Sequence, residues 1–232
     1  DAALEAGVKR LVLISTDKAV DPICVYGSSK FLSERIVMEA NKRADAGQEF
    51  MVVRFGNVLG SRGSIVPLFK SQIEKGGPVT VTHPDMRRFF MTIPEACSLV
   101  LKTGGVGRCG ESYLLDMGEP VRIRDLAEQM IRFYGYEPGR DIRIEYVGLR
   151  PGEKVEERLH AADEIIAPTE YPLVNRLERR GPAFPLAEVL AALEPACRLS
   201  PGLEKDFRNR RRLRAALKKF VPTLIVPDHE PE

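Results

Sequence analysis

Residues 11–35 read LVLISTDKAVDPICVYGSSKFLSER, and this stretch indicates the fold class. It opens with the apolar run 11–14, which is typical of a strand buried on both faces of a parallel sheet. The polar residues 15–18 follow at once and therefore fall at the carboxyl end of that strand, where open α/β sheets bind ligands. Asp21 and Pro22 break the chain, and a helical pattern starts near Val25. The stretch predicts an α/β fold with a ligand site at this strand end.

Tyr26 and Lys30 are four residues apart, so on a helix they share one face. A neighbouring ammonium group favours the phenolate form of a tyrosine. The pair therefore has the chemistry to move a proton from a hydroxyl group of a sugar. The alternative is a tyrosine and a lysine on the surface of an ordinary helix.

The segment Tyr26-Gly-Ser-Ser-Lys30 resembles the YxxxK motif of the short-chain dehydrogenase/reductase superfamily. Together with the Ser-Thr-Asp-Lys segment 15–18, it most closely resembles the UDP-N-acetylglucosamine 4,6-dehydratases of polysaccharide biosynthesis. The resemblance runs from about residue 6 to 159, and more loosely to 197. It implies the carboxyl-terminal part of a Rossmann-like, doubly wound parallel sheet, followed by a small α/β substrate-binding domain.

The resemblance also implies catalytic roles. Tyr26 would take the proton of the C4 hydroxyl, and Lys30 would support it and bind the nicotinamide ribose. Thr16 would bond the C4 oxygen, Asp17 would act as the acid at the C6 oxygen, and Lys18 would be the base at C5. A plain 4-epimerase needs no second acid and base, so residues 16–18 favour a dehydratase. Many large membrane-linked relatives carry methionine where this chain has Tyr26, which leaves the subfamily open.

The remaining site residues are expected from the same resemblance. Ser15, Phe55 and Val58 would contact the cofactor together with Tyr26 and Lys30. Asn57 would contact the sugar. In the block Arg150-Pro-Gly-Glu153, the arginine would bind phosphate and the glutamate the ribose. A guanidinium group suits phosphate oxygens. A second cation for the diphosphate is expected at Arg88, with Arg87 as the alternative and Arg62 as the next candidate.

Composition excludes several classes of protein. The chain has 232 residues and a formal net charge of +2, so nothing global indicates nucleic-acid binding. Its four cysteines form no CxxC pair, and its three histidines lack metal-ligand spacing, so we expect neither disulfides nor a metal. No apolar run approaches the ~20 residues that a membrane helix needs. These features predict a cytoplasmic enzyme.

The sequence lacks a glycine-rich GxxGxxG or GxGxxG fingerprint, the loop that binds the pyrophosphate of a dinucleotide. We therefore expect a piece of a longer enzyme whose preceding part holds most of the NAD or NADP site. That part would decide between the two cofactors. We also expect a homo-oligomer, with membrane association possible through the preceding part. The alternatives are a UDP-sugar 4-epimerase of the same fold and a non-catalytic binding or assembly domain.

Three regions are expected. Residues 1–62 would be the remainder of the NAD(P)-binding domain, 63–167 mainly the nucleotide-sugar-binding region with segments returning to the core, and 168–232 an extension. Within the extension, residues 204–219 hold eight Lys or Arg against two Asp or Glu, and are expected to be a solvated tail or a basic helix that contacts an anionic surface. The expected strands are 11–14, 50–55, 79–82, 111–116 and 142–147, and the expected helices 25–44, 65–75, 92–103, 124–134 and 186–193.

Overall fold

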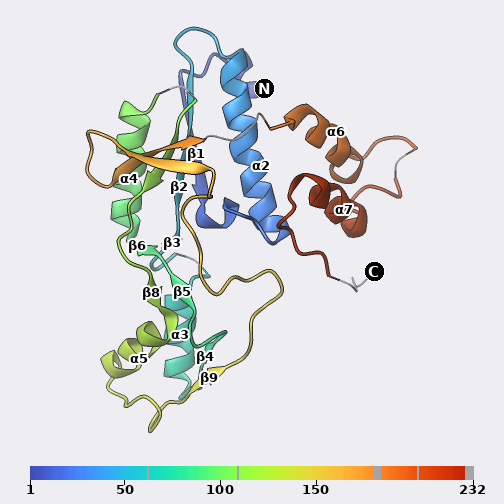
Figure 1. Cartoon of the computed structure of the whole chain (residues 1–232). Coiled ribbons are helices and arrows are strands. Elements are labelled where there is room, and N and C mark those ends of the chain that lie inside the picture. Colours follow the sequence, from blue (N-terminus) through green and yellow to red (C-terminus); the bar gives the residue numbers. More distant parts are fainter. Residues whose placement is uncertain (62, 109, 180–183, 203, 228–232) are drawn as a thin grey trace.

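The computed structural model describes residues 1–61, 63–108, 110–179, 184–202 and 204–227. Figure 1 shows one lobe built on a sheet that is flanked by helices, a smaller lobe below it, and a pair of carboxyl-terminal helices beside the first lobe. Each of the three parts has its own cluster of buried apolar side chains. The site described below lies where the two lobes meet.

The main sheet has five strands in the order β1 (Arg10–Thr16), β2 (Glu49–Phe55), β7 (Ser112–Leu115), β11 (Val174–Arg179) and β10 (Glu164–Pro168). The first three run parallel, and β10 and β11 form an antiparallel hairpin at the far side. This confirms the predicted α/β fold with parallel strands. The hairpin was not expected from the sequence, and it carries the main sheet past residue 168.

Strand β2 lies between β1 and β7, and its two faces are covered by different helices. Its side chains alternate between the faces, as in every strand. Met51, Val53 and Phe55 pack with residues of α4 (Ile93–Val106) in one core cluster. Arg54 points to the other face and contacts α2 (Val25–Ala40). All residues of β2 after Glu49 are buried, and the strand predicted over residues 50–55 is confirmed.

The prediction that residues 11–14 are buried on both faces is wrong. Within the described residues β1 pairs only with β2, so it is an edge strand of the sheet. Leu11 to Leu13 are half-buried, and the side chain of Ile14 is 49% exposed. An apolar run occurs in central strands and also in edge strands whose apolar side chains are partly exposed. Hydrophobicity alone therefore does not distinguish the two kinds of strand.

The smaller lobe packs α3 (Ile65–Glu74) against α5 (Ile123–Phe133) and the short parallel pair β4 (Val79–Val81) and β9 (Ile144–Tyr146). Phe69, Ile73 and Ile131 are fully buried in its core. The predicted helices and strands of this region are therefore confirmed within one or two residues at most ends. Two small pairs connect the lobes: β3 (Asn57–Val58) with β6 (Phe90–Met91), and β5 (Arg87–Arg88) with β8 (Val121–Arg122).

Local signals set several helix ends. Thr92 and Glu95 form a capping box at the start of α4: each side chain accepts a hydrogen bond from the other's backbone N–H. Helix α2 ends at Ala40 and continues as the 3-10 turn η2 (Asn41–Arg43), close to the expected end at residue 44. Two further short elements are α1 (Ala2–Glu5) and the 3-10 turn η1 (Asp17–Ala19).

The carboxyl-terminal helices α6 (Leu186–Cys197) and α7 (Arg210–Phe220) pack against α2. Leu193 and Leu217 share a buried cluster with Leu32 of α2. The expectation of a solvated tail or a single basic helix over 204–219 is corrected, since α7 begins only at Arg210, after Asn209, whose side chain caps it. The basic segment is therefore anchored by its apolar face and is not a free tail.

Candidate active site

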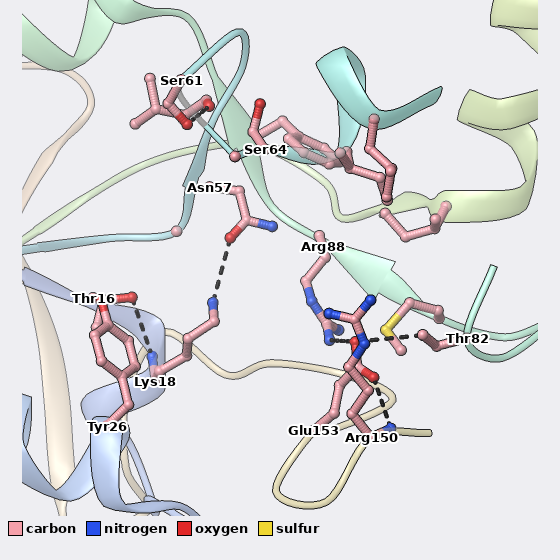
Figure 2. Close-up of a pocket in the computed structure, with 18 of the residues that line it drawn as sticks. Thr16, Lys18, Tyr26, Asn57, Ser61, Ser64, Thr82, Arg88, Arg150 and Glu153 are labelled. Carbon is pink, nitrogen blue, oxygen red and sulfur yellow. Dashed lines mark hydrogen bonds and ion pairs between the residues drawn. The ribbon is translucent and has the colours of Figure 1, made fainter. Parts of the chain in front are cut away.

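A cleft of about 560 Å³ opens at the carboxyl ends of β1 and β2, between the two lobes (Figure 2). Both lobes contribute to its walls, since Thr16 and Tyr26 come from the sheet lobe and Thr82 and Ile123 from the smaller one. Most of the residues singled out from the sequence line it: Ser15, Thr16, Lys18, Tyr26, Lys30, Phe55, Asn57, Val58, Arg88, Arg150 and Glu153. The fold thus brings together positions that are far apart in the chain.

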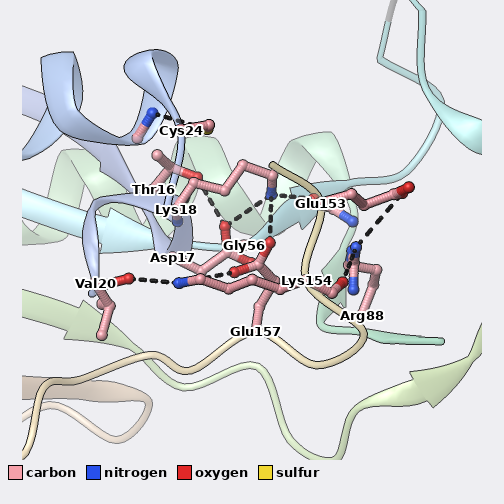
Figure 3. A network of polar contacts seen from close by, with 12 residues as sticks. Thr16, Asp17, Lys18, Val20, Cys24, Gly56, Arg88, Glu153, Lys154 and Glu157 are labelled. Atoms are coloured by element: carbon pink, nitrogen blue, oxygen red, sulfur yellow. Dashed lines mark hydrogen bonds and ion pairs between the residues drawn. The ribbon is translucent and has the colours of Figure 1, made fainter. Parts of the chain in front are cut away.

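Lys18 lies at the centre of a polar network (Figure 3). Its Nζ is 2.9 Å from Oδ1 of Asp17 and donates across the cleft to Oδ1 of Asn57 at 3.3 Å. A third oxygen, Oε1 of Glu157, is 3.9 Å away. The lysine side chain is 31% exposed, so it is held on one side and open to the cleft on the other. The Lys18 amino group is therefore positioned to contact a ligand bound in the cleft.

Asp17 does not line the cleft. Its side chain is completely buried behind Thr16 and Lys18, and its Oδ1 accepts hydrogen bonds from the Thr16 hydroxyl at 2.8 Å and from Lys18. Its second oxygen, Oδ2, has no hydrogen-bond partner among the described residues. In this structure, Asp17 therefore touches the cleft only through its two neighbours.

Tyr26 and Lys30 lie on the first turns of α2 and both face the cleft. Tyr26 is 55% exposed, and among the described residues its hydroxyl has no hydrogen-bond partner. The helix starts at Cys24, whose sulfur accepts a hydrogen bond from the N–H of Gly27. Gly27 touches the backbone of Lys18, so the start of α2 is pressed directly onto η1. The tyrosine and the lysine network are thereby held beside each other.

The loop that follows β9 carries Arg150 and Glu153 to the opposite wall of the cleft (Figure 2). Glu153 accepts hydrogen bonds from the Arg150 backbone at 3.1 Å and from the Thr82 hydroxyl at 3.3 Å. The Arg150 guanidinium makes no hydrogen bond or ion pair with a described residue. Gly152 lies against Cys24, where a Cβ would be 2.7 Å from that of the cysteine. The loop therefore leaves one guanidinium available to an anion in the cleft.

The two neighbouring arginines of β5 face different sides. Arg88 lines the cleft and is buried, and its guanidinium donates to the backbone carbonyls of Lys154 and Val155 at 2.7 and 3.0 Å. It thus ties the Arg150 loop to β5. Arg87 is not among the residues that line the cleft. The geometry favours Arg88 over Arg87 as the second cation, while Arg62 lies outside the described residues.

A buried ion network behind the cleft was missed by sequence reasoning. Arg54 donates to both carboxylate oxygens of Glu34 and of Glu164, at 2.7–3.2 Å. Burial acts to lower the pKa of Arg54, but the two carboxylates outweigh it and raise that pKa. The Ser15 hydroxyl, expected to contact the cofactor, donates to Glu34 at 2.5 Å and is buried. Any cofactor contact of Ser15 would therefore come from its backbone.

Glu157 is the second site residue that sequence reasoning missed. Its side chain is buried beside Lys18 and Lys154, and it lines a cavity of about 320 Å³ that adjoins the cleft. Burial raises the pKa of the Glu157 carboxyl, although the charge of Lys18 opposes the shift. The only signal in the sequence was an acidic residue four positions after Glu153, in a segment without helical or strand periodicity.

Two negative findings concern the described part of the chain. No three His, Cys, Asp or Glu side chains gather there as they would around a metal ion. None of the described helices is long and apolar enough to span a membrane.

Comparison with known proteins identifies a family that covers most of the chain. The family described as "polysaccharide biosynthesis protein" matches residues 1–179. The capsular polysaccharide biosynthesis protein CapD of Staphylococcus aureus is 51% identical over 176 residues, which cover 76% of this chain and 29% of CapD. A UDP-glucose 4-epimerase of Rickettsia typhi is 30% identical over 232 residues, covering 100% of this chain and 65% of the epimerase. The matched region thus covers less than a third of the length of CapD.

Solved structures agree as well. Pen from Bacillus thuringiensis superimposes with a TM-score of 0.68 at 34% identity, over 78% of this chain and 55% of Pen. The dTDP-glucose 4,6-dehydratase of Bacillus anthracis, solved with NAD, shares the fold with a TM-score of 0.55 at 21% identity, over 65% of this chain and 53% of that one. The fold is that of the short-chain dehydrogenase/reductase enzymes, to which nucleotide-sugar epimerases and dehydratases belong. Within that class, the chain belongs to the polysaccharide biosynthesis protein family.

Proposed function

We propose that this chain works as the carboxyl-terminal part of an NAD(P)-dependent nucleotide-sugar 4,6-dehydratase. The proposed substrate is UDP-N-acetylglucosamine, and the product a UDP-2-acetamido-2,6-dideoxy-4-keto-hexose for capsule, O-antigen or glycan synthesis. One observation carries the proposal: Lys18 faces the same cleft as Tyr26 and Lys30. The site therefore holds a second proton-moving group besides the tyrosine.

The first step uses the groups on α2. Tyr26, as phenolate, takes the proton of the C4 hydroxyl, and Lys30 on the next turn stabilises the phenolate charge. Thr16 bonds the C4 oxygen from the end of β1. When bound, NAD or NADP supplies a nicotinamide that accepts the hydride from C4 and returns it at C6. Phe55 and Val58 form the wall of the cleft beside which that ring would lie.

The second step is the loss of water. The new ketone at C4 acidifies the C5 proton, and Lys18, as the neutral amine, removes it. The electrons of the C5–H bond form the C5=C6 double bond as the C6 hydroxyl leaves. We assign Asp17 as the source of the proton for that oxygen. Because its carboxyl is buried, the proton travels through Thr16 or Lys18, to both of which Asp17 is hydrogen-bonded.

Binding of the nucleotide falls to the opposite wall. Arg150 offers a free guanidinium, which binds diphosphate oxygens in a forked geometry. Arg88 adds positive charge to that wall, Glu153 faces the ribose, and Asn57 reaches the sugar beside Lys18. Together they place C5 of the sugar next to the lysine.

The test is turnover in heavy water by the complete enzyme, meaning a protein that carries this chain together with a cofactor-binding segment. A dehydratase that uses Lys18 places deuterium at C5 of the product, and Lys18→Ala abolishes both the exchange and the loss of water. Oxidation at C4 survives in that variant and is seen as reduced cofactor by its near-ultraviolet absorbance. Interconversion of C4 epimers without C5 exchange would refute the dehydratase and leave the fold unaffected.

The second candidate is a UDP-sugar 4-epimerase. It is favoured by the Rickettsia typhi relative named above, whose similarity extends over the whole chain. An epimerase needs only Tyr26, Lys30 and a small hydroxyl side chain such as Thr16, and it never opens the C5–H bond. The heavy-water experiment therefore separates the two functions directly.

We also propose that the chain alone is inactive, because it spans only part of its relatives and lacks the pyrophosphate-binding fingerprint. Calorimetric titration of the chain with NAD and with NADP tests this, and a low-micromolar dissociation constant for either would contradict it. The unpaired edge of β1 and the exposed Ile14 give the chain a place for further strands or for a second copy. Self-association in solution is accordingly expected.

A further inference from the structure

Three glutamates among the described residues are buried around the site, and they differ in their hydrogen bonding. Glu34 and Glu164 are each held by two nitrogens of Arg54, and the Ser15 hydroxyl and the Ala161 N–H donate further bonds to them. Buried carboxylates are normally satisfied in this way. Such glutamates are held in place by their donors and serve the architecture.

The surroundings of Glu157 differ in their hydrogen-bond donors. It is 5% exposed, yet no described residue donates a hydrogen bond to it, and its Oε2 is buried without such a partner. Its contacts are two ammonium groups at ion-pair distance: Lys18 at 3.9 Å and Lys154 at 3.7 Å. A buried carboxylate with few donors binds a proton more readily than a saturated one. Four charged groups among the described residues face it. Asp17 and Lys18 come from η1, Lys154 from the loop that follows β9, and Arg88 from β5.

The surroundings give Glu157 access on two sides. It lines the cavity that contains Lys18 and Asn57. It also lines a second cavity of about 660 Å³, together with Asp116, Glu156 and His160. A group that borders both cavities is placed to exchange protons between the lysine and the solvent.

We propose that Glu157 is the proton partner of Lys18: it receives a proton from the lysine ammonium and leaves the neutral amine that the C5 step needs. The inference rests on the proposed function. In the exchange the Lys18 Nζ–H bond breaks and a Glu157 O–H bond forms. The amine then takes the C5 proton while Asp17 protonates the departing C6 oxygen, and the lysine ammonium gives a proton back to C5 when the hydride is added at C6. The proton on Glu157 then returns to the amine, and the C4 hydroxyl proton held by Tyr26 restores Asp17 through solvent, so the cycle closes.

The distance suits this role with a small adjustment. At 3.9 Å the two groups are an ion pair and not a hydrogen bond. A rotation of the lysine side chain or one bridging water closes the gap, and such bonds commonly tighten only when substrate is bound. Glu157 acts through Lys18 and does not line the main cleft, so it is a positioning residue and not a catalytic one.

The first arm of the test uses this chain alone and needs no turnover. Carboxyl-carbon NMR of the ¹³C-glutamate-labelled chain follows Glu157 during a pH titration, with Glu157→Gln to assign its signal. We expect Glu157 to titrate above the usual glutamate range, and Lys18→Met to move that titration further up, because the lysine cation opposes the shift. A Glu157 signal unaffected by Lys18→Met would overturn the inference.

The second arm measures C5 exchange by the complete enzyme as a function of pH. Glu157 must be ionised to accept a proton, so the rate should rise as pH increases through its pKa. In Glu157→Gln this rise of the rate with pH should vanish, and the exchange rate should fall by about 10²-fold. Formation of reduced cofactor should stay as in the wild type. Glu157→Asp, which keeps a carboxyl, should retain the rise of the exchange rate with pH.

Glu188→Gln is the control, because Glu188 is an exposed glutamate on α6 and is not among the residues that line either cavity. Its exchange rate and pH profile should match those of the wild type. An unchanged profile in Glu157→Gln would overturn the inference while leaving the dehydratase intact. Absence of C5 exchange in the wild type would instead refute the function on which the inference rests.

Discussion

The backbone of Gly27 lies so close to Lys18 that a Cβ on the glycine would be 2.3 Å from the lysine carbonyl oxygen. This contact joins the start of α2 to η1, and hence the proposed acid/base tyrosine to the polar network of the cleft. No other residue fits at position 27 without moving one element away from the other, because the atom it would meet belongs to the backbone. The relative position of Tyr26 and Lys18 therefore depends on a missing methyl group.

Gly27→Ala should force α2 and η1 apart and destabilise the protein by ~1–3 kcal/mol, the usual cost of overpacking. Denaturant unfolding of the chain measures this loss. Gly105→Ala is the matched control, because Gly105 lies in the last turn of α4 with no atom within 4 Å of the added Cβ. Its stability should stay equal or rise by about 0.5–1 kcal/mol. Equal effects of the two substitutions would show that the contact is not tight.

Arg54→Met should destabilise the chain strongly, since it leaves Glu34 and Glu164 buried and uncompensated. Breaking a buried ion pair by removing one partner typically costs ~3–5 kcal/mol. Urea unfolding supplies the measurement, and Lys70→Met the control, because Lys70 and Glu74 form an exposed pair on α3. Exposed pairs contribute at most about 1 kcal/mol. A loss for Arg54→Met no larger than that for Lys70→Met would contradict a structural role of the network.

Acid should weaken the same network. Burial acts to raise the pKa of Glu164, but the hydrogen bond from Arg54 outweighs it and holds that pKa below the usual value. A carboxyl with a lowered folded-state pKa stabilises fully above its unfolded pKa, about 4.3 for glutamate, and loses this contribution as pH falls through the folded value. Unfolding curves recorded below pH 5 should therefore show a decline that Glu164→Gln reduces. An equally steep decline in the variant would argue against this assignment.

Glu157 should show the opposite sign. Its pKa is raised, so its carboxyl favours the folded state below its unfolded pKa, and this contribution is lost as pH rises through the folded value. Glu157→Gln should consequently be at least as stable as the wild type at neutral pH, although it lowers C5 exchange. A thermal unfolding series between pH 4 and pH 8 tests the direction. If Glu157→Gln became less stable relative to the wild type as the pH rises, the assignment would be contradicted.

Tyr26→Phe in the complete enzyme should remove oxidation at C4 and leave binding of the UDP-sugar nearly intact, since only the hydroxyl is lost. Loss of a general acid/base commonly lowers the rate by ~10²–10⁴-fold. Single-turnover formation of reduced cofactor and calorimetry with UDP-sugar provide the two readouts. Equal losses in both would mean that Tyr26 is structural.

Arg150→Ala in the complete enzyme should weaken UDP and UDP-sugar alike, because the guanidinium binds the part that they share. The expected loss is ~1.5–3 kcal/mol of binding free energy, the value of a hydrogen bond to a charged group. Arg87→Ala is the control, as the Arg87 backbone bonds the same loop at Val155 but Arg87 is not among the residues that line the cleft. Unchanged UDP affinity in Arg150→Ala would move the phosphate site to another cation, with Arg62 next to be tested.

Local features could be predicted from the sequence because each is set by neighbours in the chain. The strand over 50–55, the capping box at Thr92 and the shared face of Tyr26 and Lys30 follow from hydrophobic period and helical spacing. The same holds for the polar segment 15–18 at the end of a strand. These signals, with the resemblance that they carry, were enough to identify the fold class and the family.

What only the tertiary structure decided depends on contacts between distant segments. The apolar run of β1 proved to be an edge strand, the hairpin β10–β11 extended the sheet, and Asp17 was buried behind its neighbours. Packing likewise supplied the carboxylates around Arg54 and brought Glu157 to Lys18, from a loop without periodicity. A residue's burial and partners are set by the packing of whole elements, which the spacing of residues along one element does not encode.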